Sequence, residues 1–206
     1  MLEESCPIEV FATELQRRIQ EGTGDAQKDL QTLPCLNEEA PIAEAMARSK
    51  GMWVDLSEIS CLGTPFPSGV ENDVYLNPHG NVIYKVNNLI TSKTLLSLFF
   101  RLNLHNSIFP QTAYMLQGFT GFGNGSIYPI LRQDFIPNER EATPIEIDMY
   151  MSALGFKKHS ATTFSNENVE VSDLHPRNVL RDSDGDLYVI DAEFRLLMKR
   201  EEIIDK

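Results

Sequence analysis

The chain has 206 residues, of which 42% are hydrophobic and 23% are charged, as in an ordinary soluble globular protein. Its formal net charge of −12 excludes the broad basic surface used to bind nucleic acid or anionic membranes, although a local basic pocket for a nucleotide stays open. The scattered Cys6, Cys35 and Cys61 predict reduced thiols. No secretory signal or run of about 18 apolar residues is visible. We therefore expect a cytoplasmic protein of bacterial or phage type, with no membrane and no nucleic-acid partner.

Two amphipathic helices are predicted in the first quarter of the chain. In residues 8–21 the apolar side chains recur at helical spacing, at Ile8, Phe11, Leu15 and Ile19. A second helix is predicted over 38–50, with Asn37 as a plausible N-cap and Gly51 at its end. We expect residues 1–52 to form an N-terminal helical layer that packs on the main domain and has no catalytic role.

Short strands are predicted after this layer. A strand over 53–59, a Gly- and Pro-rich loop over 63–69 and strands over 70–76 and 82–86 together predict an antiparallel meander. Lys85 lies in the last of these strands between apolar residues, where a lysine must either reach the edge or meet an anion. An edge lysine in solvent is the alternative.

A helix and a hairpin are predicted next. The helix covers 92–107, with Ser92 as its N-cap and Pro110 stopping it. Two strand-like runs, 113–122 and 126–135, are joined by the segment GFGNG. That segment resembles a phosphate-binding glycine loop, but no helix follows it, so a hairpin turn is favoured.

A polar connector over 135–141 is the best candidate for a boundary between lobes. It divides the main part of the chain into residues 53–136 and 137–206. A further helix is predicted over 143–156, because Thr143 is a natural N-cap and a proline follows it.

Two acids and an amide lie close to apolar strands near the end of the chain. Asn178 follows Asp173 by five residues, and Asp191 follows a strand-like run. Oxygens of Asp and Asn side chains are hard ligands suited to Mg²⁺, which shares its coordination with phosphate. These three residues therefore predict a site for metal-bound phosphates.

A calcium loop is an alternative use of part of the same stretch. Three alternating acids and a glutamate in the twelfth position lie at Asp182, Asp184, Asp186 and Glu193. A calcium loop needs glycine in its sixth position, where this chain has Leu187, and helices on both sides. A solvated β-turn containing Gly185 is favoured.

The order of these elements and motifs resembles the protein-kinase-like fold, most closely the compact kinase domains of bacterial and phage polyvalent proteins. Three stretches carry the resemblance: Gly69–Tyr75, Tyr84–Asn88 and Asp173–Leu180. It covers residues 53–197. It implies an α+β, bilobal fold with an antiparallel N-lobe sheet and a minimal C-lobe, preceded by the N-terminal helices.

The resemblance also implies a site for ATP and Mg²⁺. Lys85 would hold the nucleotide phosphates, and Asp173 would orient or deprotonate an acceptor hydroxyl, as the catalytic pair. Asn178 and Asp191 would bind Mg²⁺. His175 is outside this set and is expected to brace the loop.

The remaining residues of the predicted nucleotide site are Gly63, Gly69 and Glu71. Kinases pair the strand lysine with a helix glutamate, but residues 92–107 contain no acid. Glu71 is the nearest substitute partner for Lys85, and a surface glutamate is the alternative.

Three functions stay open from the sequence. The first is an atypical minimal kinase that transfers the ATP γ-phosphoryl group to an unidentified hydroxyl acceptor. The second is a pseudokinase-like nucleotide-binding or protein-interaction module, favoured by the missing helix acid and by the 15 residues that follow Asp191. The third is a structural interaction domain without a nucleotide. A protein partner is possible in each case.

Overall fold

The computed structural model describes residues 6–22, 34–67, 69–123, 125–137 and 140–197. Parts of the predicted N-terminal layer (1–5 and 23–33) and of the predicted C-lobe (198–206) lie outside the described residues. The chain divides into two compact units. Unit 1 comprises Met1–Ser107 and Ala113–Phe135, and unit 2 comprises Ile108–Thr112 and Ile136–Lys206. Both units combine helix with antiparallel sheet, which confirms the α+β class.

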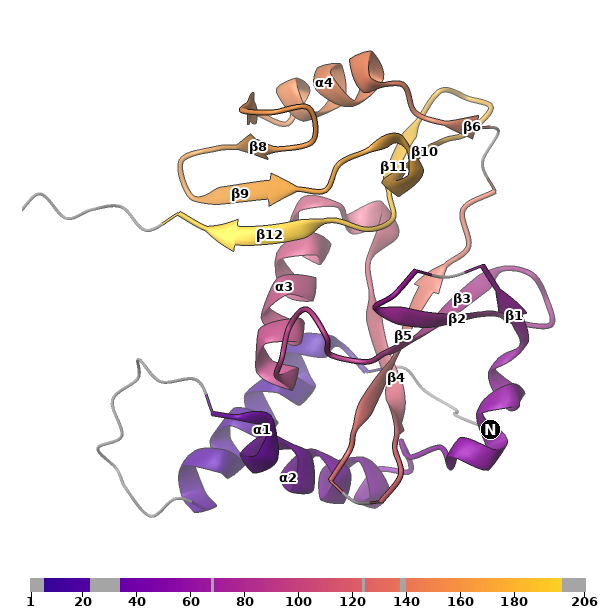
Figure 1. The fold of residues 1–206 in the computed structure, drawn as a ribbon, viewed down its shortest axis with the longest axis vertical. Helices are drawn as coiled ribbons and strands as arrows, with labels where there is room; N and C mark the ends of the chain where they lie inside the picture. The colour runs from indigo at the N-terminus through magenta and orange to yellow at the C-terminus, as the bar shows by residue number, and fades with distance from the viewer. Residues whose placement is uncertain (1–5, 23–33, 68, 124, 138–139, 198–206) are drawn as a thin grey trace, which may run out of the picture. The chain divides into compact units, whose positions relative to one another are not determined.

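Unit 1 is built on a five-stranded antiparallel sheet in the order β1–β2–β3–β5–β4 (Figure 1). Its strands are β1 (Thr64–Phe66), β2 (Asn72–Leu76), β3 (Val82–Asn87), β4 (Met115–Thr120) and β5 (Tyr128–Asp134). The predicted meander is confirmed in β2 and β3, which pair with Asn72 opposite Asn87 and Leu76 opposite Ile83. The strand β3 is central, because it pairs with β2 on one side and with β5 on the other.

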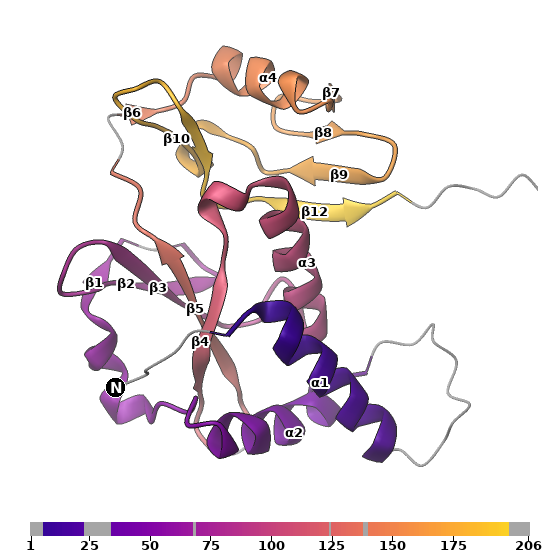
Figure 2. The same ribbon diagram turned by 180° about the vertical axis from the view of Figure 1, so that it is seen from behind.

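Three helices belong to the same unit: α1 (Ile8–Gly22), α2 (Leu36–Ser49) and α3 (Leu95–Ile108, whose last residue is counted in unit 2). Figures 1 and 2 show them beside the β4 side of the sheet from opposite directions. The periodicity predicted for the first helix is confirmed, because its four apolar residues are its buried ones. They join the α2, α3 and β4 side chains in one core.

Three local predictions in unit 1 were wrong. The predicted strand 53–59 makes only an isolated bridge at Trp53, and a 3-10 helix covers Leu56–Leu62. The chain leaves the sheet edge because the Glu58 amide bonds the Asp55 carbonyl. Asn37 lies inside α2, and Cys35 is the N-cap; the Glu38 carboxylate accepts the Cys35 amide at 3.0 Å.

The third wrong prediction concerns the start of α3. Ser92 is not the N-cap, because Thr94 Oγ1 accepts the Ser97 amide at 3.1 Å and the helix begins at Leu95. Lys93, with φ +65°, separates Ser92 from the first turn. By contrast, the predicted hairpin turn at GFGNG is confirmed, since it joins β4 to β5.

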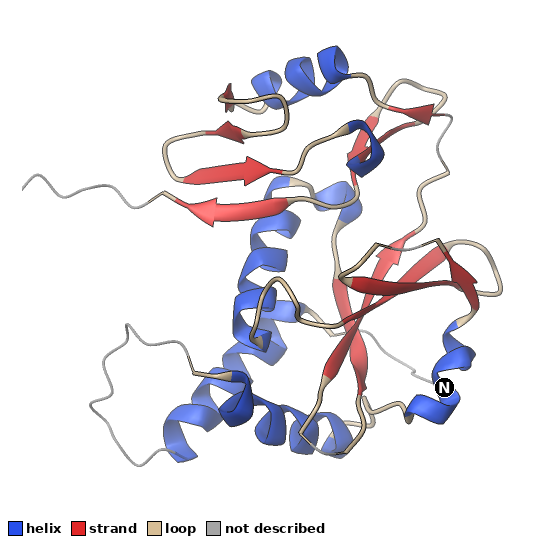
Figure 3. Ribbon diagram, in the orientation of Figure 1, coloured by secondary structure: helices blue, strands red, loops and turns tan. Residues whose placement is uncertain are grey.

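Unit 2 contains one described α-helix and short strands (Figure 3). The helix α4 (Pro144–Ala153) begins as predicted: Thr143 Oγ1 accepts the Glu146 amide at 3.3 Å, and the Glu146 carboxylate accepts the Thr143 amide at 2.7 Å. The strands are β6 (Arg140–Glu141), β7 (Lys157–Lys158), β8 (Phe164–Ser165), β9 (Val169–Ser172), β10 (Val179–Arg181), β11 (Leu187–Val189) and β12 (Glu193–Leu196). They form two sheets, β11–β10–β6 and β12–β9–β8–β7. Among the described helices of both units, none is long and apolar enough to span a membrane.

Candidate functional site

Lys85 lies on the central strand of the unit 1 sheet, opposite Val74 of β2 and Leu131 of β5. Directly paired residues of antiparallel strands share a face. Leu131 belongs to the core that contains the helices, so Lys85 is on the helix-facing side. Its ammonium donates to the Tyr114 hydroxyl at 2.8 Å and lies 4.8 Å from the centre of the Tyr114 ring. The solvent-edge alternative for Lys85 is therefore wrong.

Glu71 has a different partner from the one predicted. Its Oε1 lies 2.6 Å from Arg101 Nη2 of α3, and the side chains are 19% and 12% exposed. The Asn87 amide donates to the same Glu71 oxygen at 3.3 Å. Glu71 thus pairs with Arg101 rather than Lys85, because it precedes β2 and lies beyond the strand position opposite Lys85.

The two predicted glycines differ in their surroundings. Gly63 has φ +141°, and a Cβ built there would lie 2.0 Å from the Leu76 carbonyl oxygen. It therefore permits close approach of the chain to the end of β2. Gly69 lies in the connection between β1 and β2, and a Cβ there would meet nothing within 4 Å. Gly69 is the one of the two that leaves space for a ligand.

Asp173 is held in an unusual backbone conformation within unit 2. Its φ is +62°, in the left-handed region that non-glycine residues rarely adopt. Asn178 Nδ2 donates to both the carbonyl oxygen and Oδ2 of Asp173 at 3.0 Å. The His175 backbone amide donates to the same carbonyl at 2.9 Å. These bonds fix a carboxylate that is still 54% exposed.

Asp191 is brought towards this loop by backbone pairing. The Ile190 amide donates to the Asn178 carbonyl at 2.9 Å, and Glu193 of β12 pairs with Ser172 of β9. The segment that carries Asp191 is thereby fastened beside both Asp173 and Asn178. Among the described residues, no group of three or more His, Cys, Asp or Glu side chains could hold a metal ion. A cation here would need the Asn178 oxygen and ligands from a phosphate.

The segment from Asp182 to Asp186 is the turn of the β10–β11 hairpin, as predicted. Asp182 Oδ1 accepts the amides of Asp184 and Asp186 at 3.0 and 2.9 Å, and Oδ2 accepts the Tyr188 hydroxyl at 3.1 Å. Burial opposes ionisation of Asp182, but these donors outweigh it and lower its pKa. The Asp182 carboxylate is thus engaged within the turn rather than turned out as a calcium ligand.

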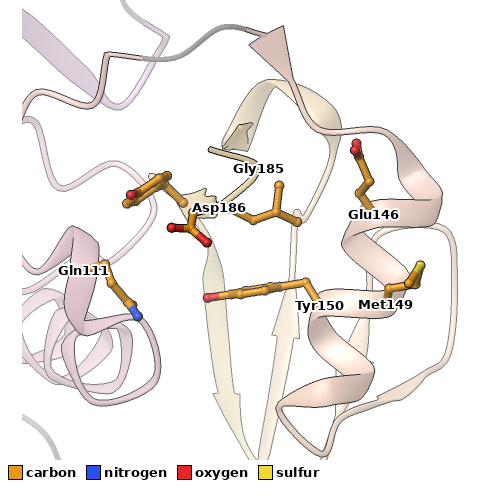
Figure 4. A pocket seen from close by; sticks show the side chains of 8 residues that line it. Gln111, Glu146, Met149, Tyr150, Gly185 and Asp186 are labelled. Atoms are coloured by element: carbon orange, nitrogen blue, oxygen red, sulfur yellow. The ribbon is translucent and has the colours of Figure 1, made fainter. Parts of the chain in front are cut away.

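A separate cavity of about 430 Å³ lies within unit 2. It is lined by Gln111, Glu146, Met149, Tyr150, Gly185, Asp186, Leu187 and Tyr188. Figure 4 shows the Tyr150 ring extending across it, with the Asp186 carboxylate nearby. Burial raises the pKa of Tyr150. Bonds from Arg140 and Thr143 engage Glu146 and hold its pKa well below the usual range. None of the predicted site residues lines this cavity.

Comparison with protein families identifies the family of the chain. A family described as a serine/threonine/tyrosine kinase found in polyvalent proteins matches residues 37–198. The chain belongs to this family. The resemblance seen in the sequence is confirmed, and the match begins at Asn37, so it includes most of α2. No curated protein matches the chain.

Two residues of this polyvalent-protein kinase domain were missed by the sequence reasoning. Tyr114 contacts Lys85, and Arg101 pairs with Glu71, each across about 30 residues of sequence. Neither residue belongs to a motif. A single tyrosine before a strand and a single arginine in an apolar helix are common, so neither is a signal by itself. The only signal in the sequence was that α3 contains no acid to pair with Lys85.

Proposed function

We propose that the chain is an ATP- and Mg²⁺-dependent kinase that transfers the γ-phosphoryl group to a hydroxyl acceptor. The observation that carries this proposal is the Asp173 loop. A carboxylate in a strained backbone conformation, exposed and fixed by the Asn178 amide, is typical of a functional site. The family assignment supports a kinase-like function and, with it, the use of a nucleotide.

In this proposal Lys85 binds the nucleotide phosphates by charge. Lys85 is partly buried on a central strand and oriented by Tyr114. Gly69 lies in the exposed connection between β1 and β2, where its backbone is open to a ligand. We propose that Gly63 contributes to the nucleotide site only by shaping the β1–β2 hairpin. The Leu76 carbonyl lies too close to Gly63 to leave room for a ligand.

The residues of the Asp173 loop fit a magnesium ion. The Nδ2 atom of Asn178 donates to Asp173, which leaves its Oδ1 oxygen available as a ligand. The Asp191 carboxylate is exposed, and it has no hydrogen bond or ion pair within the described part of the chain. When bound, Mg²⁺ would offset negative charge on the phosphate oxygens.

The proposed transfer step uses Asp173 as the proton acceptor. The acceptor oxygen forms a bond to the γ-phosphorus while the bond to the bridging β–γ oxygen breaks and ADP leaves. The hydroxyl proton passes to a carboxylate oxygen of Asp173. Its Oδ2 is bonded to Asn178, and its Oδ1 lies 3.6 Å from His175 Nε2, so Oδ1 is the oxygen with room for the incoming proton.

Phosphoryl transfer tests the proposal. Radiolabelled γ-phosphate would be followed into the protein itself, into water and into Ser-, Thr- and Tyr-containing peptides. We expect Asp173→Asn to lower the rate about 100-fold or more, the usual contribution of a general base. Asp191→Asn should raise the Mg²⁺ concentration required. The matched control is Asp184→Asn, which removes another exposed charge, from the β10–β11 turn, and should leave the rate unchanged. Equal rates for wild type and Asp173→Asn would contradict the proposal.

A nucleotide-binding module without phosphotransfer is the second candidate. It is favoured by the pairing of Glu71 with Arg101, which leaves neither Glu71 nor any acid of α3 to serve as the partner of Lys85. Stabilisation by ATP and Mg²⁺ in a thermal melt, with no label transferred to any acceptor, would favour this candidate over the kinase.

A further inference from the structure

We propose that Tyr114 is a positioning residue for Lys85, in the role that a helix glutamate has in other kinases. The inference rests on the proposed nucleotide-binding function of Lys85. In kinases generally, an ion pair with a helix acid holds the strand lysine in its active orientation. The helix α3 carries no acid, so an acid of this helix cannot orient the lysine.

The hydrogen bond carries the contact between the two side chains. The Tyr114 hydroxyl accepts a hydrogen bond from Lys85 Nζ at 2.8 Å, and the ammonium lies 4.8 Å from the ring centre, beyond the ring edge that bears the hydroxyl. A neutral hydroxyl directs the ammonium without adding a full negative charge. Tyr114 can therefore orient Lys85 while leaving its charge to interact with phosphate.

Tyr114 is itself held rigidly by α3. It is 3% exposed, and its backbone amide and carbonyl both bond the Asn106 side chain, at 2.7 and 2.8 Å. Its ring meets His105 edge to face, with 4.9 Å between the ring centres. Asn106 and His105 both belong to α3. The helix thus controls the position of Lys85 through Tyr114 rather than through an acid of its own.

The charge arrangement of α3 agrees with this assignment. Its Arg101 forms a largely buried pair with Glu71, which precedes β2. The acid and the base are therefore exchanged relative to the usual kinase pair: the helix supplies the cation and the sheet side supplies the anion.

A double-mutant cycle on nucleotide binding tests the assignment. Calorimetric titration with ATP and Mg²⁺ would compare wild type, Tyr114→Phe, Lys85→Ala and the double variant. Tyr114→Phe keeps the ring but removes the hydroxyl, and it should weaken binding roughly tenfold or more, as expected for one hydrogen bond to a charged group. The double variant should bind like Lys85→Ala, because the hydroxyl acts only through the lysine.

The matched control is Tyr84→Phe, which removes a hydroxyl from the residue next to Lys85 and should leave binding unchanged. Unchanged binding by Tyr114→Phe alongside a large loss in Lys85→Ala would overturn the positioning role and keep the proposed function. If the double variant lost as much binding free energy as the two single variants together, the role would also be overturned. Such additive losses would show that the Tyr114 hydroxyl acts independently of Lys85.

A second readout separates this inference from the proposed function. If wild type binds no nucleotide, the proposed function fails, and the contact is tested on the lysine alone. Reductive methylation followed by peptide mass spectrometry would report the reactivity of Lys85 against pH. Loss of the hydroxyl removes a bond to the charged ammonium, so Tyr114→Phe should speed methylation of Lys85 several-fold, with exposed Lys157 as internal reference. An unchanged Lys85 rate overturns the assignment.

Discussion

The buried carboxylate of Glu39 offers a test of how α3 is held. Glu39 lies on α2 and is fully buried, yet it accepts the backbone amides of Leu95 at 2.5 Å and Leu96 at 3.3 Å. These are among the first amides of α3, which have no partner within their own helix. A residue of one helix thus caps another helix, so its removal should destabilise unit 1.

The expected cost follows from the two amides. Losing an N-cap acceptor costs about 0.5–2 kcal/mol. Glu39 serves two amides, but desolvation of its own charge offsets part of the gain. We expect Glu39→Ala to lower the free energy of unfolding by about 2 kcal/mol, equivalent to about 4–8 °C in melting temperature for a chain of this size. Glu39→Gln keeps an acceptor and should lose less than half as much.

The raised pKa of Glu39 makes its contribution to the free energy of unfolding depend on pH. Burial raises the pKa of Glu39 above its ordinary value of 4.5, so the folded protein binds this proton more tightly than the unfolded chain does. The stabilising contribution is therefore fully present below pH 4.5 and declines as pH rises through the raised folded-state pKa. Urea unfolding at several pH values would measure it. Equal stability of wild type and Glu39→Ala at every pH would refute the capping role.

Two further predictions concern a glycine and an ion pair. Gly63→Ala should destabilise the protein by about 3 kcal/mol in urea unfolding, because the new Cβ meets the Leu76 carbonyl at a positive φ; Gly69→Ala is the control and should unfold like wild type, and similar losses in both would contradict this account. The hydrogen bond from Arg140 is the main cause of the lowered pKa of Glu146. The Glu146 carboxylate therefore stabilises unit 2 when the pH is above 4.5, its ordinary pKa, and this contribution is lost as the pH falls through the lower folded-state pKa. Thermal melts of Glu146→Gln should accordingly depend less on pH in the acid range than melts of wild type, and parallel curves would show that the pair contributes nothing.

Features encoded in short stretches could be predicted from the sequence. The buried face of α1 follows from apolar spacing, and the α4 start follows from Thr143 and Glu146, which lie three residues apart. The loop from Asp173 to Asn178 was found because its residues are neighbours in the chain and bond one another directly. In each case the interacting groups are close in sequence, so local chemistry determines the geometry.

The contacts that were missed join distant parts of the chain. Glu71 and Arg101 form an ion pair although 30 residues of sequence separate them, so no local pattern could predict it. Ser92 was predicted as the N-cap of α3, but the local Thr94 accepts the Ser97 amide, and Glu39, more than 50 residues away, accepts the amides of Leu95 and Leu96. The tertiary partners Arg101 and Glu39 could not be predicted from neighbouring residues.

The segment Ile108–Thr112 has a consequence for how the protein can be divided. It belongs to unit 2, while the residues immediately before and after it belong to unit 1. Within unit 2, Phe109 stacks on Tyr150 at 6.4 Å between ring centres, and the Thr112 hydroxyl donates to the Val189 carbonyl at 2.6 Å. A gene segment encoding only residues 136–206 therefore encodes a unit with an aromatic side chain and a hydroxyl donor missing from its interior. A contiguous segment that contains all of unit 2 must start at or before Ile108, so it also carries β4 and β5 of unit 1.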